Sequence, residues 1–151
     1  MTMFRFRPHT SMLVPYVDKT PVRIHFSTRV VRPLHFNQVN RNWFVYVQVP
    51  PDVMDYIALM ESELNDVLTK RRRCHPCHMR SCITDGGSLP VKVRFHDNVF
   101  EPMVVDAQGE PVEWGCIRAM HPMTIDIECI GIQPKHTHPY LMWNAKAATV
   151  S

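Results

Sequence analysis

Thirteen prolines, spread from Pro8 to Pro139, constrain the fold of this 151-residue chain more than any other feature. A proline inside a helix removes a backbone hydrogen bond and clashes with the preceding turn. Prolines at such short intervals cut the chain into short extended pieces and argue against a helical bundle. We therefore expect a fold built mainly of β-strands.

Alternating apolar and polar residues predict where those strands lie. In residues 22–36, Val22, Ile24 and Phe26 fall on one face, while Arg23 and His25 fall on the other. Residues 43–49 are aromatic and β-branched, which favours a second strand, with Phe44, Tyr46 and Gln48 on the face opposite Trp43, Val45, Val47 and Val49. Further strands are expected in residues 91–97, in a hairpin over 101–114 that turns at 107–109, and in residues 123–133 and 140–150.

One helix is predicted, in residues 51–70. Asp52 and Asp55 lie near its positively polarised start, and apolar residues recur at spacings of three and four. Two strands, one helix and about four further strands are typical of a small barrel, such as the oligonucleotide-binding (OB) barrel. The predicted fold class is α+β, mainly β: an OB-like barrel of five to six strands, with a helix inserted between early and late strands.

The length of the chain predicts a single domain. We interpret residues 1–20 as an extended N-terminal arm, residues 21–151 as the barrel, and residues 74–89 as a Cys/His loop within it. The arm is the predicted contact for a second copy of the chain or for assembly partners. No apolar run reaches the roughly 18 residues that span a bilayer, so no membrane partner is expected. Five Cys without an export signal indicate an intracellular protein with reduced thiols.

The segment CHPCHMRSC contains the residues that favour a metal site. Cys-x-x-Cys spacing lets two thiolates reach one tetrahedral zinc ion. If zinc is bound, Cys74 and Cys77 are ligands, and Cys82, His78 or His138 completes the site. The alternative is a flexible basic loop with free thiols. Zinc is the one cofactor that the sequence suggests.

Cations and aromatic residues are interleaved along the first two predicted strands. Single-strand-binding proteins use this mixture, because a positive groove follows the phosphates while aromatic faces stack on bases. Tyr46 is a candidate stacking ring; Trp43 and Phe44 are either part of the same surface or core residues, since alternation cannot bury both. The cations of these strands are Arg23, Arg29, Arg32 and Arg41.

The basic segment that follows the predicted helix has two interpretations. Arg71 and Arg72 belong to the run KRRRCHPCHMR, which is either a patch that follows phosphates or a solvated helix end. The net charge of +3, from 17 basic and 14 acidic residues, permits a nucleic-acid partner without requiring one.

Four segments of the C-terminal half carry a resemblance to a known family: VKVRF, VVDAQGEPVEW, IDIECIGI and KHTHPYLMWNAK. They resemble the end of the single-stranded-DNA-binding proteins of large eukaryotic DNA viruses. The most specific pieces are Gly131–Ile132 and Met142–Trp143. The resemblance implies an OB barrel, single-stranded DNA as the partner, and a place in the host nucleus, the host cytoplasm or a virion.

The sequence thus predicts a single-stranded nucleic-acid-binding protein. No Gly-rich phosphate loop, Gly-x-Ser-x-Gly or His-Glu-x-x-His motif is present, so we predict no enzymatic activity. The alternative function is a structural or assembly subunit, for example a virion component, that uses the barrel for packing. The predicted interface residues are the cations Arg23, Arg32, Arg41, Arg71, Arg72, Lys92, Arg94 and Lys135 and the rings Tyr46, Trp114 and Trp143.

Overall fold

Five long strands form the main body of the structure. The computed structural model describes residues 2–71, 79–134 and 138–151, with the backbone alone at Arg71. The barrel strands are β4 (Arg23–Asn37), β5 (Asn42–Gln48), β6 (Ser88–His96), β10 (Pro122–Gly131) and β11 (Met142–Val150). The other elements are β1 (Arg5–His9), β2 (Met12–Val17), β3 (Thr20–Pro21), α1 (Pro51–Arg71), β7 (Val99–Glu101), β8 (Val104–Val105), β9 (Pro111–Val112) and the 3-10 turn Trp114–Cys116.

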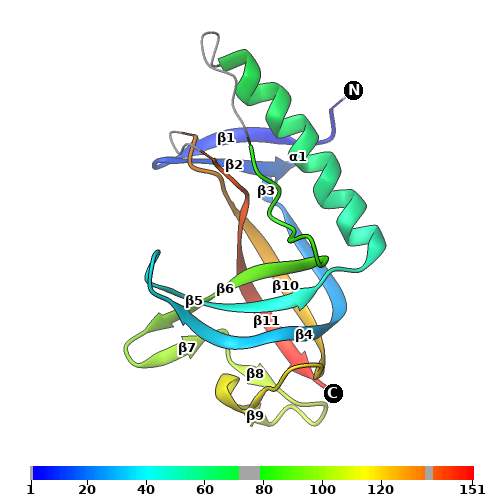
Figure 1. Cartoon of the computed structure of the whole chain (residues 1–151), viewed down its shortest axis with the longest axis vertical. Helices are drawn as coiled ribbons and strands as arrows, with labels where there is room; N and C mark the ends of the chain where they lie inside the picture. The colour runs from blue at the N-terminus through cyan, green and yellow to red at the C-terminus, as the bar shows by residue number, and fades with distance from the viewer. Residues whose placement is uncertain (1, 72–78, 135–137) are drawn as a thin grey trace.

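The sheet closes on itself because β6 and β11 pair in parallel, with Lys92 opposite Asn144. All other neighbours in the ring are antiparallel: β4 pairs with β5 and β10, β5 pairs with β6, and β10 pairs with β11. The ring order is therefore β4, β5, β6, β11, β10, with α1 inserted in the chain between β5 and β6 (Figure 1). The predicted fold class, a mainly β OB-like barrel with one inserted helix, is confirmed.

Side chains at alternate positions fill the interior of the barrel. On β5, Val45 and Val47 are buried while Gln48 is exposed, and on β6 Val91 and Val93 are buried. This alternation follows from the two-residue period of a strand and confirms the face assignment predicted for residues 43–49. The intervening residues of both strands point outward, where a ligand can reach them.

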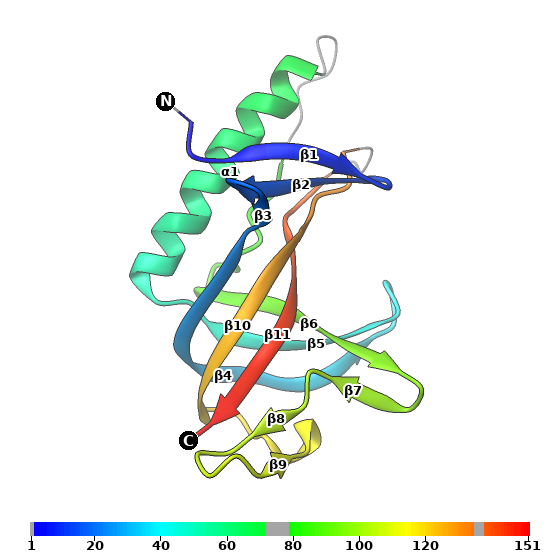
Figure 2. The ribbon, with the colours of Figure 1, turned by 180° about the vertical axis from the view of Figure 1, so that it is seen from behind.

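Helix α1 packs an apolar stripe against the rest of the fold. It runs along one side of the molecule and passes the N-terminal strands (Figures 1 and 2). Its bounds, Pro51–Arg71, agree with the predicted 51–70. The buried residues of the stripe recur at spacings of three and four, which places them on one helix face: Val53, Ile57, Met60, Leu64 and Leu68.

The N-terminal segment is not the extended arm that the sequence predicted. β1 and β2 form an antiparallel hairpin, to which β3 adds, and the hairpin crosses the ends of β10 and β11 (Figure 2). Leu13 and Ile132 exchange two backbone hydrogen bonds of 2.9 and 3.0 Å. Phe4 is buried with its ring edge-on to Tyr56. The prediction was wrong because these contacts hold the segment against the barrel and the helix.

The start of β6 also differs from the sequence-based prediction. β6 begins at Ser88, inside the loop predicted for residues 74–89, and runs through Pro90. Within β6, Pro90 lies opposite Tyr46 of β5. Within the described ranges, no helix is long and apolar enough to cross a lipid bilayer.

Candidate nucleic-acid interface

Outward side chains of β4, β5 and β6 form one continuous surface, which we call the barrel face. Residues opposite one another in an antiparallel pair lie on the same face of a sheet. Arg32 pairs with Tyr46 and His35 pairs with Phe44 across β4 and β5, and Phe44 pairs with Lys92 across β5 and β6. The barrel face comprises Arg32, His35, Phe44, Tyr46, Lys92 and Arg94.

Tyr46 lies near the centre of this surface, in contact with Arg32 and His35 of β4. The Arg32 Cζ atom lies 6.0 Å from the centre of the Tyr46 ring. The His35 ring lies on β4 with its centre 5.4 Å from that of Tyr46, at an interplanar angle of 37°. The half-buried Tyr46 ring is therefore supported by its neighbours and still partly open to solvent, as a stacking platform requires.

The strands that carry the barrel face contain no acidic residue. β4, β5 and β6 together hold five Lys or Arg and no Asp or Glu. The three ion pairs found among the described residues lie elsewhere and use none of Arg32, Lys92 or Arg94. Glu101 is opposite Arg94 on β7 but is not within ion-pair distance of it. These cations are therefore free to meet phosphate groups.

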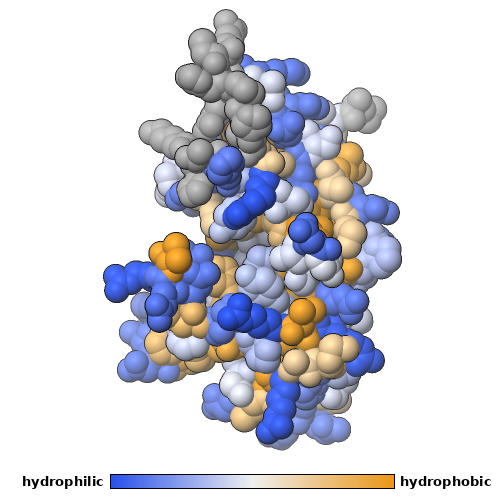
Figure 3. Space-filling view, viewed as in Figure 1, coloured by the Kyte–Doolittle hydropathy of each residue, from blue (hydrophilic) through white to orange (hydrophobic). Residues whose placement is uncertain are grey.

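The space-filling view shows how hydrophilic and apolar side chains are distributed over these strands. Hydrophilic side chains dominate where β4, β5 and β6 cross the front of the molecule, and apolar patches interrupt them (Figure 3). Such a mixed surface suits a ligand with charged phosphates and flat apolar bases.

A second group of rings lies at the end of the barrel, where β5 and β6 run past its rim. We call Phe36, Trp43, Phe95 and Phe100 the rim cluster. Trp43 meets Phe36 and Phe100 edge-on, at centre distances of 5.3 and 5.1 Å. Phe36 and Phe95 are 44% and 46% exposed, so the cluster presents rings to solvent.

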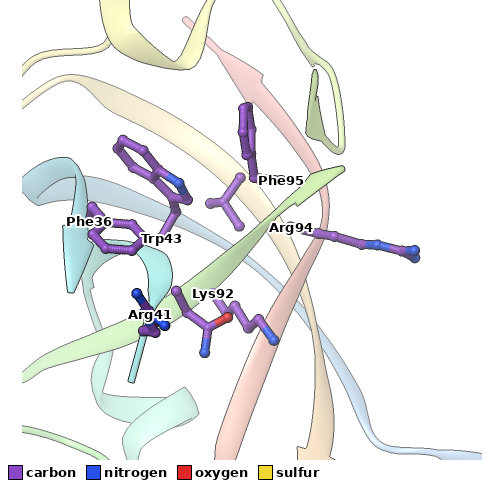
Figure 4. Close-up of a pocket in the computed structure, with 8 residues that line it drawn as sticks. Phe36, Arg41, Trp43, Lys92, Arg94 and Phe95 are labelled. Atoms are coloured by element: carbon purple, nitrogen blue, oxygen red, sulfur yellow. The ribbon is translucent and has the colours of Figure 1, made fainter. Parts of the chain in front are cut away.

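A surface pocket joins the rim cluster to nearby cations. Phe36, Trp43 and Phe95 line it together with Arg41 and with the β6 residues Lys92, Val93 and Arg94. In Figure 4 the rings gather on one side of β6, while Lys92 and Arg94 extend toward the other. The cations therefore belong to the barrel face, and the rings continue the inward-facing rows of β5 and β6 beyond the rim.

The structure brings together five of the predicted interface residues and separates one from them. Arg32, Tyr46, Lys92 and Arg94 share the barrel face, and Arg41 borders the pocket. Arg23 is exposed but lies opposite Glu128 on β10, nine residues before Arg32. At about 3.3 Å per residue it is roughly 30 Å away along the strand. Arg23 is therefore not part of this surface.

Two of the predicted stacking rings are core residues. Trp114 and Trp143 are 3% and 1% exposed. The Trp114 indole N–H donates to the Pro102 carbonyl at 2.8 Å, which fixes the turn. Trp143 falls in the same alternating row as the buried Leu141 and Ala145. Neither ring can stack on a base in this structure, so both predictions are corrected.

The remaining predicted residues lie wholly or partly outside the described part of the chain. Arg72, Lys135, Cys74, Cys77 and His78 are not among the described residues, and Arg71 is described by its backbone only. The zinc prediction and the basic helix-end prediction therefore stay predictions. In the described ranges, no group of three or more His, Cys, Asp or Glu is arranged to hold a metal ion.

Cys82, a conditional zinc ligand, is described and buried. Its backbone N–H donates to a carboxylate oxygen of Glu61 at 2.8 Å, and the other oxygen accepts a hydrogen bond from the Ser81 hydroxyl. Burial, and next the negative charge of Glu61, raise the pKa of the Cys82 thiol far above its usual value. Cys82 stays a conditional ligand, because its predicted partners Cys74 and Cys77 lie outside the described residues.

Four residues of the site, His35, Phe36, Phe95 and Phe100, were not predicted from sequence. Phe95 belongs to the row of Val91 and Val93, and this pattern indicates a core position unless the strand is known to outrun the barrel. Phe36 and His35 follow register shifts in β4 near Pro33, which break the alternation from which faces are inferred. The only available signal was the density of aromatic residues in residues 35–46.

The five-stranded ring and its inserted helix define an OB-like barrel. No protein-family model matches the sequence, and no curated protein matches it either. The fold is similar to the solved structure of the single-stranded DNA-binding protein from bacteriophage Enc34, in a C-terminal truncation, with a TM-score of 0.56 and 10% identity. The match covers 97% of this chain and 94% of that chain. At this identity the likeness concerns the fold.

Proposed function

We propose that this chain binds single-stranded nucleic acid through the barrel face, without catalysing a reaction. The observation that carries the proposal is the partly open Tyr46 ring, which contacts Arg32 and His35. The three strands of this surface, β4, β5 and β6, contain no acidic residue. The similarity of the fold to a single-stranded DNA-binding protein supports it.

The expected binding mode follows from the chemistry of the barrel face. Arg32, Lys92 and Arg94 neutralise phosphates and release condensed counterions, so that affinity falls as salt rises. Tyr46, and the half-buried Phe44 beside it, offer ring faces on which bases stack. Because every base has an aromatic face, we expect weak sequence preference.

A titration with fluorescently labelled oligo-dT tests the phosphate contacts. Arg32→Gln should lower the slope of log affinity against log salt by about 0.7, which is the contribution of one phosphate contact on a single strand. Arg23→Gln is the matched control, because it removes the same charge from the same strand outside the barrel face. Equal slopes for both variants and the wild type would contradict the proposal.

A second pair of variants tests stacking on the barrel face. Tyr46→Ala should weaken binding by roughly 1–3 kcal/mol, the usual contribution of one stacked base. Tyr46→Phe retains the ring and should retain most of the affinity. A thermal melt of each variant separates lost binding from lost folding. Weakening by Tyr46→Phe as large as that by Tyr46→Ala would exclude stacking.

Two narrower statements belong to this proposal. We propose DNA as the preferred nucleic acid, from the resemblance in sequence and the fold similarity. Oligo-dT and oligo-U titrations side by side test that preference. Membership among the proteins of large eukaryotic DNA viruses, and a place in the host cell or virion, rest on the C-terminal residues Gly131–Ile132 and Met142–Trp143.

One observation favours the alternative function, a structural or assembly subunit. Val39 is 96% exposed at the turn between β4 and β5, and Phe36, Phe95 and Val99 are also exposed at this end of the molecule. Exposed apolar residues of this kind are found at protein contacts. Two results together would favour this function. The wild-type protein would sediment as an oligomer without nucleic acid, and it would show no salt-dependent affinity for oligo-dT or oligo-U.

A further inference from the structure

Two further Arg–Tyr pairs lie outside the barrel face, Arg7 with Tyr16 on the N-terminal hairpin and Arg80 with Tyr140, and the second is the closer contact. The Arg80 Cζ atom lies 4.7 Å from the centre of the Tyr140 ring, closer than Arg32 lies to Tyr46. Arg80 is exposed and Tyr140 half-buried. The chemistry of this pair is that of the barrel face: a guanidinium that can meet a phosphate, and a ring that remains partly open.

The backbone around Arg80 is held in place at several points. The Arg80 N–H donates to the Pro139 carbonyl at 2.8 Å, which ties the segment after α1 to the segment before β11. The next two residues, Ser81 and Cys82, are bound by the carboxylate of Glu61 on α1. The backbone that carries the pair is therefore held in place, and only side chains need to be ordered when a ligand binds.

The alternation of burial places Tyr140 on the same side of the chain as the barrel face. Leu141, Trp143 and Ala145 are buried, while Tyr140 and Asn144 are partly exposed. Asn144 lies opposite Lys92 in the register of β11 and β6. Tyr140 precedes Asn144 by four residues, which corresponds to roughly 13 Å of extended chain.

Charge also favours a nucleic acid at this position. None of the ion pairs among the described residues uses Arg80. The neighbouring carboxylate, that of Glu61, is buried and already accepts two hydrogen bonds. The Arg80 guanidinium is therefore available to an anionic group from solution.

We propose that Arg80 and Tyr140 form a second contact for the same single strand that crosses the barrel face. This inference rests on the proposed function and extends it. A strand that contacts Lys92 and continues along the outward side of β11 reaches Tyr140, where one base stacks on the ring and one phosphate pairs with Arg80. The binding site is then longer than the barrel face alone.

Oligonucleotide length provides the test. OB barrels bind about 4–16 nucleotides, so oligo-dT of about 4 and about 16 nucleotides brackets the barrel face and the extended site. Arg80→Gln should lower the salt slope by about 0.7 with the long oligonucleotide and leave it unchanged with the short one. Arg118→Gln, which removes an exposed arginine after the 3-10 turn, is the matched control and should leave both slopes unchanged.

The ring is tested in the same experiment. Tyr140→Ala should weaken binding of the long oligonucleotide about ten-fold, while Tyr140→Phe should not. Thermal melts show whether a variant has lost affinity through unfolding. Arg80→Lys retains the positive charge and should therefore retain the salt slope. If Arg32→Gln alters the slope and Arg80→Gln does not, the second contact is overturned and the proposed function stands. If the wild type binds neither oligonucleotide, both fail.

Discussion

The carboxylate of Glu61 on α1 accepts a hydrogen bond from the backbone N–H of Cys82, at 2.8 Å, in a buried position. Its other oxygen accepts from the Ser81 hydroxyl at 2.9 Å. This residue therefore joins the helix to the segment that leads into β6, and it also fixes the backbone next to Arg80.

Replacing Glu61 tests this connection. Glu61→Ala leaves a buried backbone N–H and a hydroxyl without their partner, so we expect a loss of about 1–3 kcal/mol of unfolding free energy. Asp66→Ala is the matched control, since Asp66 is an exposed acidic residue of the same helix and should change stability by less than about 0.5 kcal/mol. Urea unfolding measures both. Equal losses would show that the Glu61 contacts contribute nothing specific.

The two buried thiols make stability depend on pH in the alkaline range. Burial raises the pKa of Cys82 and Cys129, that of Cys129 to about 12. Because the unfolded chain releases these protons near the ordinary thiol pKa of 9.0 and the folded chain does not, the unfolded state is favoured as pH rises. The contribution of these thiols to the unfolding free energy is therefore fully present below about pH 9, and that of Cys129 is lost progressively between about pH 9 and about pH 12.

Unfolding measurements over this range give the size of the effect. Each raised thiol contributes a slope of up to about 1.4 kcal/mol per pH unit. Cys129→Ala should make the decline of unfolding free energy with pH shallower, whatever its effect on stability at pH 7. A Cys129→Ala variant with an unchanged slope would contradict the raised pKa of Cys129.

The exposed Cys116 should react with a thiol reagent at pH 8 much faster than the buried Cys82.

The sequence patterns predicted the barrel strands well because burial in them is set by a simple period. Alternation placed Val45 and Val47 inside and Tyr46 outside, and the three-and-four spacing gave the helix within one residue. The pairing partner of each strand was not encoded in these periods. The parallel contact of Lys92 with Asn144, which closes the barrel, depends on residues 52 positions apart and has no local signal.

The candidate site could be predicted only in part for the same reason. Arg32 and Tyr46 were named from one strand each, and the structure places them together because the register brings them opposite. Arg80 and Tyr140 are 60 residues apart in loops, where no periodicity applies, and their contact is a product of the tertiary fold. The N-terminal hairpin was missed because its anchors, Phe4 and Leu13, find their partners far along the chain.

Trp143 provides a contrast between folding and binding. Because it is 1% exposed in the barrel core, Trp143→Ala should reduce the unfolding free energy by about 3–5 kcal/mol. Tyr46→Ala, on the barrel face, should reduce affinity with a much smaller effect on unfolding. Denaturant titrations and binding titrations on both variants separate the two roles. A stable Trp143→Ala protein with weakened binding would restore Trp143 as a stacking residue.

Gly131 is required where the N-terminal hairpin meets the barrel. Its φ is +102°, and a Cβ atom there would lie 2.5 Å from the Leu13 carbonyl oxygen. Gly131→Ala must therefore displace β2 as well as strain the backbone, and we expect a loss of more than about 1–3 kcal/mol of unfolding free energy, the usual cost of the strain alone. Gly109→Ala is the matched control, because Gly109 has a φ of +81° and open space around it. The difference between the two losses of unfolding free energy, measured by urea unfolding, gives the cost of the contact between a Cβ atom at position 131 and β2.

Amide hydrogen exchange provides a second test. In Gly131→Ala the backbone amides of β1 and β2 should exchange with solvent faster than in the wild type. Equal losses and unchanged exchange would show that the hairpin does not depend on Gly131.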